Sequence, residues 1–551
     1  MCGVCGVYVL DKHNLPDIAR ALEVFEIDGK RLIQNGSVAA GIDYFLLRQL
    51  NNRGHDSSGI VAFDGTRLHI HKGMGFAQNV FGQESLEKLV GDIAIGHDRY
   101  ATRGLPKPEN VQPFYLNLMA LAHNGNIVNE EELRRMVIEE ETRLWGQSQI
   151  TSTTDSELKL HKLALEFHKD KKAPIEKLVA RAFSSLRGAY SVTMIIGDSL
   201  VGVRDPYGIW PLYIARLGGI ILFASERISI QKFVDAAGYK LHHSDFIRSV
   251  GGGEVEVITR QASTTHFGVL PLKDERQCSF DYSYVRSHED QKVRGFREKC
   301  GMILGDIFPA NADYVVPIPN SGIYYAKGFS EALDVPYGEL IGVSRKYKSK
   351  EYRTFQESTQ EDRLKAAKEK YIFMESYDGL RLILTDDTIV RNTTMRFVIT
   401  ELRKRRAAEI HVRIGTPSVV TPCYLGIHTP TKQELIASTL SEEHVERYFE
   451  SIFYGANYEK DELVALIRGG MSVEQIVSKS VQDEKNFLND AKLREVVPSR
   501  FSLKYMPMSG YKKAFDNVGL DSQTKCYACQ IKDGLGYPPE IRKDLVAMGV
   551  I

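Results

Sequence analysis

The chain begins with MCGVCGVYVL (residues 1–10), in which a cysteine directly follows the initiator methionine and an apolar run follows the cysteine. Removal of Met1, which we expect because the neighbouring residue is small, would give Cys2 a free α-amine with a pKa of about 7.7–8.0. Such an amine can serve as the base for the thiol, directly or through water, which is the N-terminal-nucleophile arrangement. The alternative is a small terminal residue without a role.

The bulk composition narrows the class of protein. A length of 551 residues predicts two to four domains at about 150 residues each. Lys plus Arg and Asp plus Glu both total 71, which argues against nucleic acid as the partner. No apolar run reaches the length of about 18 residues that a membrane span needs, and we find no secretion signal. The seven scattered cysteines fit catalytic or metal-binding thiols in a reducing compartment, so we expect a cytoplasmic protein.

Polar clusters interrupt the short apolar runs of the first half, and those runs are typical of a sheet-rich domain. Taken alone, HNGN is typical of a turn, because Asn-Gly favours positive φ, and TTDSE is typical of a helix N-cap. The four clusters are NNRGHDSSGI (51–60), GHDRYATRG (96–104), AHNGNIVN (122–129) and TTDSE (153–157).

In this order and spacing the clusters resemble the class II glutamine amidotransferase domain, and RDPYGIWPLY (204–213) and FASE (223–226) extend the resemblance. It implies an α+β, four-layer N-terminal-nucleophile (Ntn) glutaminase domain over residues 1–265. Cys2 would attack the glutamine carboxamide. The Asn124 side chain and the Gly125 backbone N–H would form the oxyanion hole, where a fixed donor supplies about 2.7–4 kcal/mol.

The same resemblance implies a set of glutamine-binding residues. Arg99 would bind the α-carboxylate, for which its planar fork is suited, and Asp155 would bind the α-ammonium. Arg53 would stand beside the nucleophile, and Thr102 completes the set. Asn52 and His55 depart from the pattern of the relatives, but neither position carries a role in the chemistry.

In the second half, the stretch RLILTDDTIVRNTTM (381–395) reads as an apolar strand, two aspartates, a hydroxyl-rich loop and the start of a helix. The loop and the helix N-terminus can bind an anion through backbone N–H groups. The two carboxylates would repel a phosphate but can accept hydrogen bonds from sugar hydroxyls. The combination suits a phosphorylated ribose; the alternative is an ordinary turn with a chance pair of aspartates.

This stretch resembles the phosphoribosylpyrophosphate loop of type I phosphoribosyltransferases, which have an α/β fold. With DYVVPIPNSGIYYAKGF (313–329), EYRTFQES (351–358) and PCYLGIHTP (422–430), it indicates the glutamine phosphoribosylpyrophosphate amidotransferase family. That family joins the glutaminase to a transferase domain, here 275–470 with a helical insertion near 440–470, followed by a helical extension over 471–551.

The resemblance implies that ammonia from glutamine reaches C1 of phosphoribosylpyrophosphate, with Mg²⁺, giving 5-phosphoribosylamine, glutamate and pyrophosphate in the first step of purine synthesis. It also implies purine nucleotide effectors and a homo-oligomer, either a dimer or a tetramer. A mobile loop with Arg353, Thr354 and Phe355 would close over pyrophosphate. The implied phosphoribosyl-binding residues are Ser321, Asp386, Asp387, Thr388, Arg391, Asn392, Thr393 and Thr394.

Several departures from the family pattern fall around this second site. Asn392 replaces the usual loop glycine, and its side chain is expected to enter a crowded phosphate site. Asn320 replaces an aspartate, no glycine precedes Arg353, and VRSHED (285–290) replaces a Pro-Asp-Ser stretch. These departures leave two alternatives open: a divergent relative that uses another phosphosugar, or a non-catalytic protein that senses nucleotides or assembles with a partner.

Four cysteines remain for a metal site. Cys526 and Cys529 form a CYAC pair, which alone fits zinc, redox chemistry or no function. Cys278 and Cys423 stand where a subset of the family has its other two iron–sulfur ligands, so the resemblance implies a 4Fe–4S cluster. Zinc is the alternative, because four thiolates also suit a tetrahedral site, and inert core cysteines are the third possibility.

Overall fold

Two antiparallel β-sheets face each other in the first half of the chain. A computed structural model describes residues 1–10, 26–27, 30–31, 36–100, 107–243, 245–261, 263–266, 270, 273–344, 360–427, 429, 431–483 and 500–551. The first sheet has the strand order β13-β11-β12-β1-β6-β4-β5, and the second has the order β15-β14-β10-β9-β8-β7.

The strands of the first sheet are β1 (Gly3–Val9), β4 (Ser57–Phe63), β5 (Leu68–Met74), β6 (Ile93–Arg99), β11 (Tyr213–Leu217), β12 (Ile220–Ala224) and β13 (Phe246–Ser249). Those of the second are β7 (Phe114–Leu116), β8 (Met119–Ile127), β9 (Gly188–Ile196), β10 (Ser199–Arg204), β14 (Val255–Ile258) and β15 (Ser263–His266). The short pair β2 (Glu26–Ile27) and β3 (Lys30–Arg31) lies outside both sheets.

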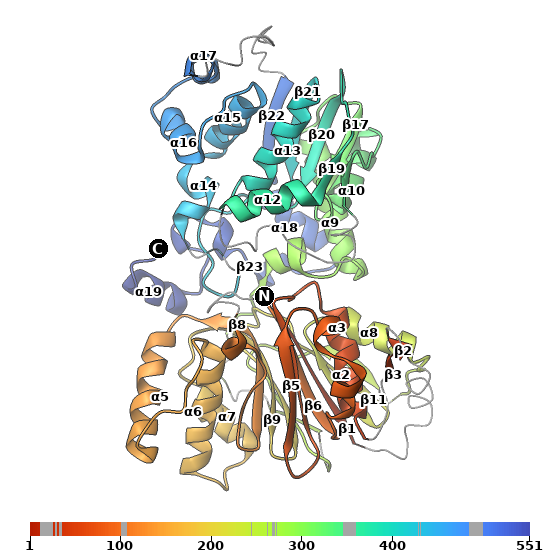
Figure 1. Cartoon of the computed structure of the whole chain (residues 1–551), viewed down its shortest axis with the longest axis vertical. Coiled ribbons are helices and arrows are strands. Elements are labelled where there is room, and N and C mark those ends of the chain that lie inside the picture. The colour runs from red at the N-terminus through yellow and green to blue at the C-terminus, as the bar shows by residue number, and fades with distance from the viewer. Residues whose placement is uncertain are drawn as a thin grey trace.

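Helices cover the outer face of each sheet (Figure 1). The alternation of apolar residues along β1 explains the layering, because Val4 and Tyr8 lie between the sheets while Val7 and Val9 face the helices. The first sheet packs on α2 (Val38–Gln49), α3 (Ala77–Val80), α4 (Gln83–Glu87) and α8 (Arg227–Ala236), and the second on α5 (Glu130–Trp145), α6 (Asp155–Lys169) and α7 (Ile175–Phe183). The four layers confirm the predicted α+β architecture.

The second half contains a parallel sheet with the strand order β17-β20-β21-β22. Its strands are β17 (Tyr314–Pro317), β20 (Arg381–Asp386), β21 (Glu409–Ile414) and β22 (Phe501–Tyr505). One face packs on α9 (Gln291–Ile307), α10 (Ile323–Leu333) and α18 (Met508–Asn517), and the other on α12 (Gln360–Lys370), α13 (Thr393–Lys404) and α15 (Glu442–Phe453). Helices on both faces of a parallel sheet confirm the predicted α/β class.

The segment predicted as a helical extension also contains a strand. β22 pairs with β21 in the parallel sheet, so residues 501–505 belong to the core of the second half. FSLKY alternates buried and half-buried positions, which is the period of a strand and not of a helix. Further helices of the second half are α14 (Ile436–Thr439), α16 (Lys460–Arg468), α17 (Val473–Asp483) and α19 (Pro539–Ala547).

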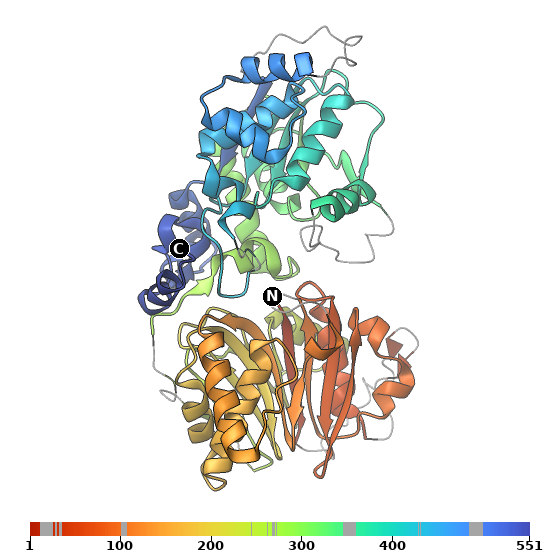
Figure 2. The same ribbon diagram turned by 60° about the vertical axis from the view of Figure 1, so that its left-hand side comes forward.

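The two halves stack along the long axis, and the N-terminus lies at their junction (Figures 1 and 2). Backbone carbonyls of Tyr424 and Leu425 in the second half accept hydrogen bonds from Asn126 Nδ2 at 2.8 Å and from Trp210 Nε1 at 2.6 Å. Arg187 Nε donates to Asp544 Oδ2 at 2.6 Å. The exact domain boundaries stay predictions.

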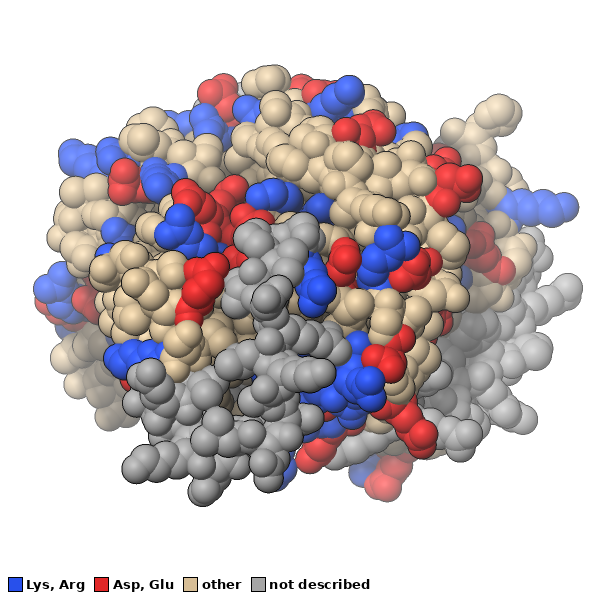
Figure 3. All heavy atoms as spheres, turned by 90° about the horizontal axis from the view of Figure 1, so that it is seen from above, with Lys and Arg blue, Asp and Glu red and all other residues tan. Residues whose placement is uncertain are grey.

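Two further features concern the surface. Seen from above, basic and acidic side chains are interspersed over the described part of the second half (Figure 3). Within the described ranges, no helix is both long and apolar enough to cross a membrane.

Candidate functional site

Cys2 lies immediately before β1, a strand near the middle of the first sheet. Its backbone N–H donates to Asn124 Oδ1 at 2.8 Å, and its Sγ accepts a hydrogen bond from the backbone N–H of Tyr100 at 3.4 Å. Both Met1 and Cys2 are buried. The thiol is therefore held at the edge where the two sheets and the second half meet.

Asn124 and Gly125 reach Cys2 from β8 in the opposite sheet. The Asn124 amide Nδ2 is buried and has no hydrogen-bond partner among the described residues. Gly125 has φ 137°, and a Cβ there would lie 2.1 Å from the carbonyl oxygen of Ala189, so only glycine fits. An unpaired buried donor beside a thiol is the arrangement that an oxyanion hole requires.

The predicted binding groups for a zwitterion lie on β6 and at the start of α6. Burial lowers the pKa of Arg99, which ends β6. Asp155 Oδ2 accepts hydrogen bonds from Lys159 Nζ at 2.8 Å and from the Ile127 backbone N–H at 3.1 Å. Burial alone would raise the pKa of Asp155, but Lys159 and His123 outweigh it and lower the pKa to about 2. Asp155 therefore stays ionised at neutral pH.

Arg53 lies beside Cys2. Its Nε donates to the backbone carbonyl of Cys2 at 3.1 Å, and its side chain is fully buried. It contacts the main chain of the nucleophile and not the thiol. Thr102 lies outside the described residues.

A second pocket lies at the carboxyl end of β20, where the predicted phosphoribosyl loop runs into α13. The cavity measures about 110 Å³. It brings together every predicted residue of this site: Ser321, Asp386, Asp387, Thr388, Arg391, Asn392, Thr393 and Thr394. Ser321 Oγ, from the loop after β17, donates to Asp386 Oδ1 at 2.7 Å.

The two aspartates of the pocket are not equivalent. Burial raises the pKa of Asp386, and burial together with the neighbouring charge of Asp386 raises the pKa of Asp387 well above its usual value. Asp387 Oδ2 and Thr388 Oγ1 are buried and lack hydrogen-bond partners in the described part of the chain. Buried polar atoms without partners are costly, so this pocket is prepared for a ligand that carries hydroxyl groups.

Asn392 adopts the left-handed conformation, with φ 64°, that the usual glycine would adopt. Its side chain lines the pocket, but its Nδ2 is held by the hydroxyl of Tyr448 at 2.8 Å. Tyr448 lies on α15, in the predicted helical insertion. Arg391, beside Asn392, pairs with Glu434. α15 thus fixes the side chain of Asn392.

Nine residues that line the pocket were not among the predicted site residues, and four of them are Lys370, Tyr371, Phe280 and Tyr284. Lys370 and Tyr371 line the cavity where α12 meets β19 (Tyr371–Phe373), and no motif marks them. Phe280 and Tyr284 line it from the segment that follows Cys278. The stretch QCSFDYSYV contains both aromatic residues but indicates only a cysteine ligand. The predicted loop residues Arg353, Thr354 and Phe355 lie outside the described residues.

The four cysteines predicted as metal ligands gather at the junction of the halves. Cys278 on β16 (Gln277–Cys278) is opposite Cys526 on the parallel strand β23 (Lys525–Cys526). Cys278, Cys526 and Cys529 belong to one apolar cluster, and Cys423 packs against it. Burial raises the pKa of all four thiols. Nevertheless, no three or more metal-binding side chains of the described residues form a group that could hold a metal ion.

The fold and the two sites define a glutamine amidotransferase of the N-terminal-nucleophile class joined to a type I phosphoribosyltransferase. Residues 97–232 match the glutamine amidotransferase domain family. The chain is 37% identical over 457 residues to an amidophosphoribosyltransferase of Methanothermobacter thermautotrophicus, covering 81% of this chain and 86% of that protein. With an amidophosphoribosyltransferase of Bacillus subtilis it shares 34% identity over 419 residues, 74% of this chain and 83% of the relative. The chain belongs to the amidophosphoribosyltransferase family.

A solved structure agrees with this assignment. The glutamine phosphoribosylpyrophosphate amidotransferase of B. subtilis, complexed with ADP and GMP, matches with a TM-score of 0.70 and 27% identity. The match covers 98% of this chain and 97% of that one. The resemblance indicated by the motifs is confirmed over both halves.

Proposed function

We propose that this enzyme hydrolyses glutamine at Cys2 and transfers the ammonia to C1 of phosphoribosylpyrophosphate. Glutamine and water give glutamate and ammonia. The nitrogen then forms a bond to C1, and the bond between C1 and the pyrophosphate oxygen breaks. The products are 5-phosphoribosylamine, pyrophosphate and glutamate, the first step of purine synthesis.

In the first half, the α-amine that removal of Met1 would expose accepts the proton of the Cys2 thiol, and the thiolate attacks the carboxamide. The developing oxyanion accepts hydrogen bonds from Asn124 Nδ2 and the Gly125 N–H. Arg99 holds the α-carboxylate of glutamine, and Asp155 Oδ1 holds its α-ammonium, since Lys159 and the backbone of Ile127 already occupy Oδ2.

In the second half, Asp386 and Asp387 accept hydrogen bonds from the ribose hydroxyls. The backbone and hydroxyls of Thr393 and Thr394, at the start of α13, hold the 5′-phosphate, where the helix dipole favours an anion. Mg²⁺ would enter with the pyrophosphate group of the substrate. The loop containing Arg353 would close over that group.

One observation carries this proposal: both predicted sites contain buried polar atoms without partners in the described structure, Asn124 Nδ2 in one and Asp387 Oδ2 and Thr388 Oγ1 in the other. A bound substrate can supply the hydrogen-bond partners that these atoms lack. The alternatives draw support from Asn392, Asn320 and the flank of Arg353. Of these, the Asn392 side chain is accounted for by its hydrogen bond to Tyr448.

The test measures glutamate and pyrophosphate together, with Mg²⁺, in the presence and absence of phosphoribosylpyrophosphate. Equal release of both products is expected. Glutamate without pyrophosphate would favour another phosphosugar as acceptor, and bound nucleotide without either product would favour a sensor. Purine nucleotide effectors and a homo-oligomer stay predictions.

We also propose that Cys278, Cys423, Cys526 and Cys529 hold a 4Fe–4S cluster with a structural or oxygen-sensing role. Their grouping around one apolar cluster, with Cys278 opposite Cys526, supports this donor set. Protein purified without oxygen should contain about four iron atoms per chain. Stoichiometric zinc without iron would favour the zinc alternative.

A further inference from the structure

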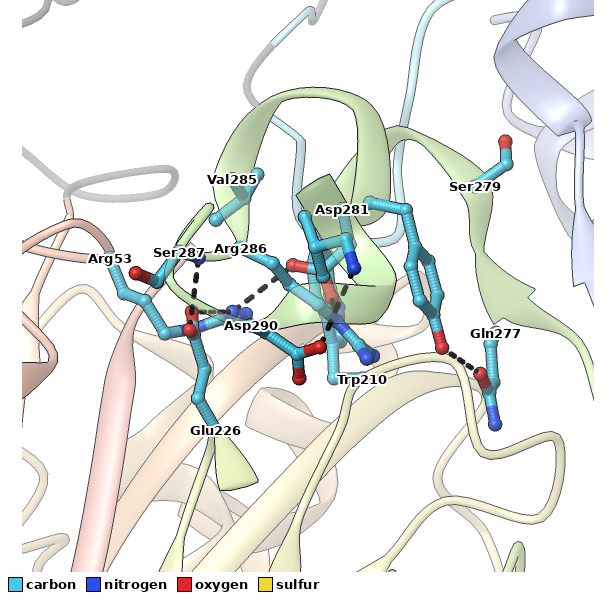
Figure 4. A network of polar contacts seen from close by, with 12 residues as sticks. Arg53, Trp210, Glu226, Gln277, Ser279, Asp281, Val285, Arg286, Ser287 and Asp290 are labelled. Carbon is cyan, nitrogen blue, oxygen red and sulfur yellow. Dashed lines mark hydrogen bonds and ion pairs between the residues drawn. The ribbon is translucent and has the colours of Figure 1, made fainter. Parts of the chain in front are cut away.

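Four charged side chains form a buried network that crosses the junction between the halves (Figure 4). Arg53 and Glu226 come from the first half, and Asp281 and Arg286 from the second. Their side chains are at most 7% exposed. Two cations and two carboxylates balance, which is the condition under which buried charges are tolerated.

Arg53 connects this network to the nucleophile. Its Nη1 donates to Glu226 Oε1 at 2.9 Å and to Asp281 Oδ1 at 3.1 Å, while its Nε donates to the carbonyl of Cys2 at 3.1 Å. The planar guanidinium fixes these donors relative to one another. The position of the Cys2 carbonyl therefore depends on a carboxylate from each half.

Asp281 lies on a segment that also contacts the other site. It begins the π-helix η2 (Asp281–Val285), and Arg286 Nε donates to its Oδ2 at 2.5 Å. Phe280 and Tyr284, on either side of Asp281, line the phosphoribosyl pocket. One short segment thus forms part of the pocket wall and holds Arg53.

Two of the departures from the family pattern, Asn52 and the stretch 285–290, meet at this network. Asn52 Nδ2 donates to Glu226 Oε1 at 2.8 Å and to the Val285 carbonyl at 3.0 Å. The Ser287 backbone N–H donates to Glu226 Oε2 at 3.0 Å. Val285 and Ser287 belong to VRSHED, so two departures that are distant in the sequence contact the same carboxylate.

Asp281 is held in its ionised form. Burial alone would raise its pKa, but the charges of Arg53 and Arg286 outweigh burial and lower it. Removal of this charge would leave two buried cations opposite one carboxylate, and Arg53 would lose the only partner that the second half gives it among the described residues.

We propose that Asp281 is a positioning residue for glutamine hydrolysis: the transferase half contributes it, and it acts through Arg53 on the main chain of Cys2. The inference rests on the proposed function, since it takes Cys2 as the nucleophile. Asn52 supports the same contact by joining Glu226 to the backbone of Val285.

The test compares Asp281→Asn with Glu289→Gln. Glu289 lies near Asp281 in the sequence and pairs with Lys232 across the same junction, but its side chain is half exposed and its ion pair does not include Arg53. For each variant we would measure kcat and KM for glutamine hydrolysis, pyrophosphate release with ammonium as the nitrogen source, and the thermal midpoint.

Displacement of a reacting group by about 1 Å can cost as much as about 100-fold in rate. We therefore expect D281N to lower kcat for glutamine hydrolysis at least about tenfold. The KM for glutamine and the ammonium-dependent reaction should change less than about twofold, because D281N removes no predicted contact to either substrate. E289Q should retain the wild-type kcat.

Wild-type kcat in D281N, or an equal loss in E289Q, would overturn the inference. If D281N does not fold, Asn52→Ala tests the same contact with all four charges in place. A fall in kcat with unchanged KM supports the inference, and an unchanged kcat overturns it. A wild-type protein that hydrolyses no glutamine would instead contradict the proposed function.

Discussion

The two sites of this molecule are built on different kinds of structure. Cys2 directly precedes β1 and Asn124 lies on β8, in two facing β-sheets whose strand register fixes their positions. Asp387, Thr388 and Asn392 lie on a loop between β20 and α13, where other elements must fix them. In the sheet-borne site the two sheets hold the residues directly, whereas in the loop-borne site α15 holds Asn392 through Tyr448.

Replacement of Cys2 should have the largest effect, and it should affect only the glutaminase site. Cys2→Ala should lower glutamine hydrolysis at least about 10,000-fold, more than about 5 kcal/mol, because no other group can form the covalent intermediate. The ammonium-dependent release of pyrophosphate should remain. Loss of both activities in a folded variant would show that the sites are not separate.

A change at Asp43, a buried acid on α2, should have the next largest effect, which falls on the free energy of unfolding. Both carboxylate oxygens of Asp43 on α2 lack partners in the described structure, and a Cβ at Gly96 would lie 2.1 Å from one of them. Burial raises the pKa of Asp43 to about 7, against about 3.9 in an unfolded chain.

The folded state therefore binds this proton more tightly than the unfolded state. The contribution of Asp43 to the free energy of unfolding is fully present below about pH 4 and is lost as the pH rises to about 7. Relative to Asp43→Asn, the wild type should lose about 4 kcal/mol of unfolding free energy over that range. Denaturant unfolding from pH 4.5 to 8 measures this, with the exposed Asp198→Asn as the control. A constant difference between wild type and D43N would contradict the assignment.

Substitution of Asp387 should weaken the use of phosphoribosylpyrophosphate by the loop-borne site. Asp387→Asn replaces a carboxyl group that would accept a hydrogen bond from a ribose hydroxyl. A buried hydroxyl left without its acceptor costs about 1–3 kcal/mol, so kcat/KM for phosphoribosylpyrophosphate should fall about 5- to 150-fold. Glutamine hydrolysis without phosphoribosylpyrophosphate should stay intact. The exposed Asp378→Asn provides a control in the same half, and an equal loss there would refute a specific role for Asp387.

Removal of the hydrogen bond between Asn392 and Tyr448 should have the smallest effect. Tyr448→Phe removes the hydroxyl that accepts from Asn392, which is worth about 1 kcal/mol, so KM for phosphoribosylpyrophosphate should rise about fivefold. In an Asn392→Gly background, Tyr448→Phe should cost less than in the wild type, because both variants remove the hydrogen bond between Asn392 and Tyr448. The remaining cost is that of the hydrogen bond from Arg396 Nη1 to the Tyr448 hydroxyl at 3.3 Å. Fully additive losses would mean that Asn392 and Tyr448 act independently.

The sequence predicted the fold classes and the grouping of residues around the phosphoribosyl pocket, since strand–loop–helix motifs are local. It did not predict that Tyr448 would hold Asn392, because 56 residues separate them and no pattern links them. The strand at 501–505 was missed because it is short and lies among helices. Phe280 and Tyr284 were missed because their role depends on how the segment after Cys278 lies between the halves.

The two sites should act as one enzyme, with ammonia passing between them inside the protein. The direct test supplies amide-15N-labelled glutamine and phosphoribosylpyrophosphate with Mg²⁺ in an excess of unlabelled ammonium, and mass spectrometry follows the 5-phosphoribosylamine after rapid quenching. If ammonia passes inside the protein, most of the product should carry 15N. Product whose 15N content equals that of the bulk ammonium would contradict it.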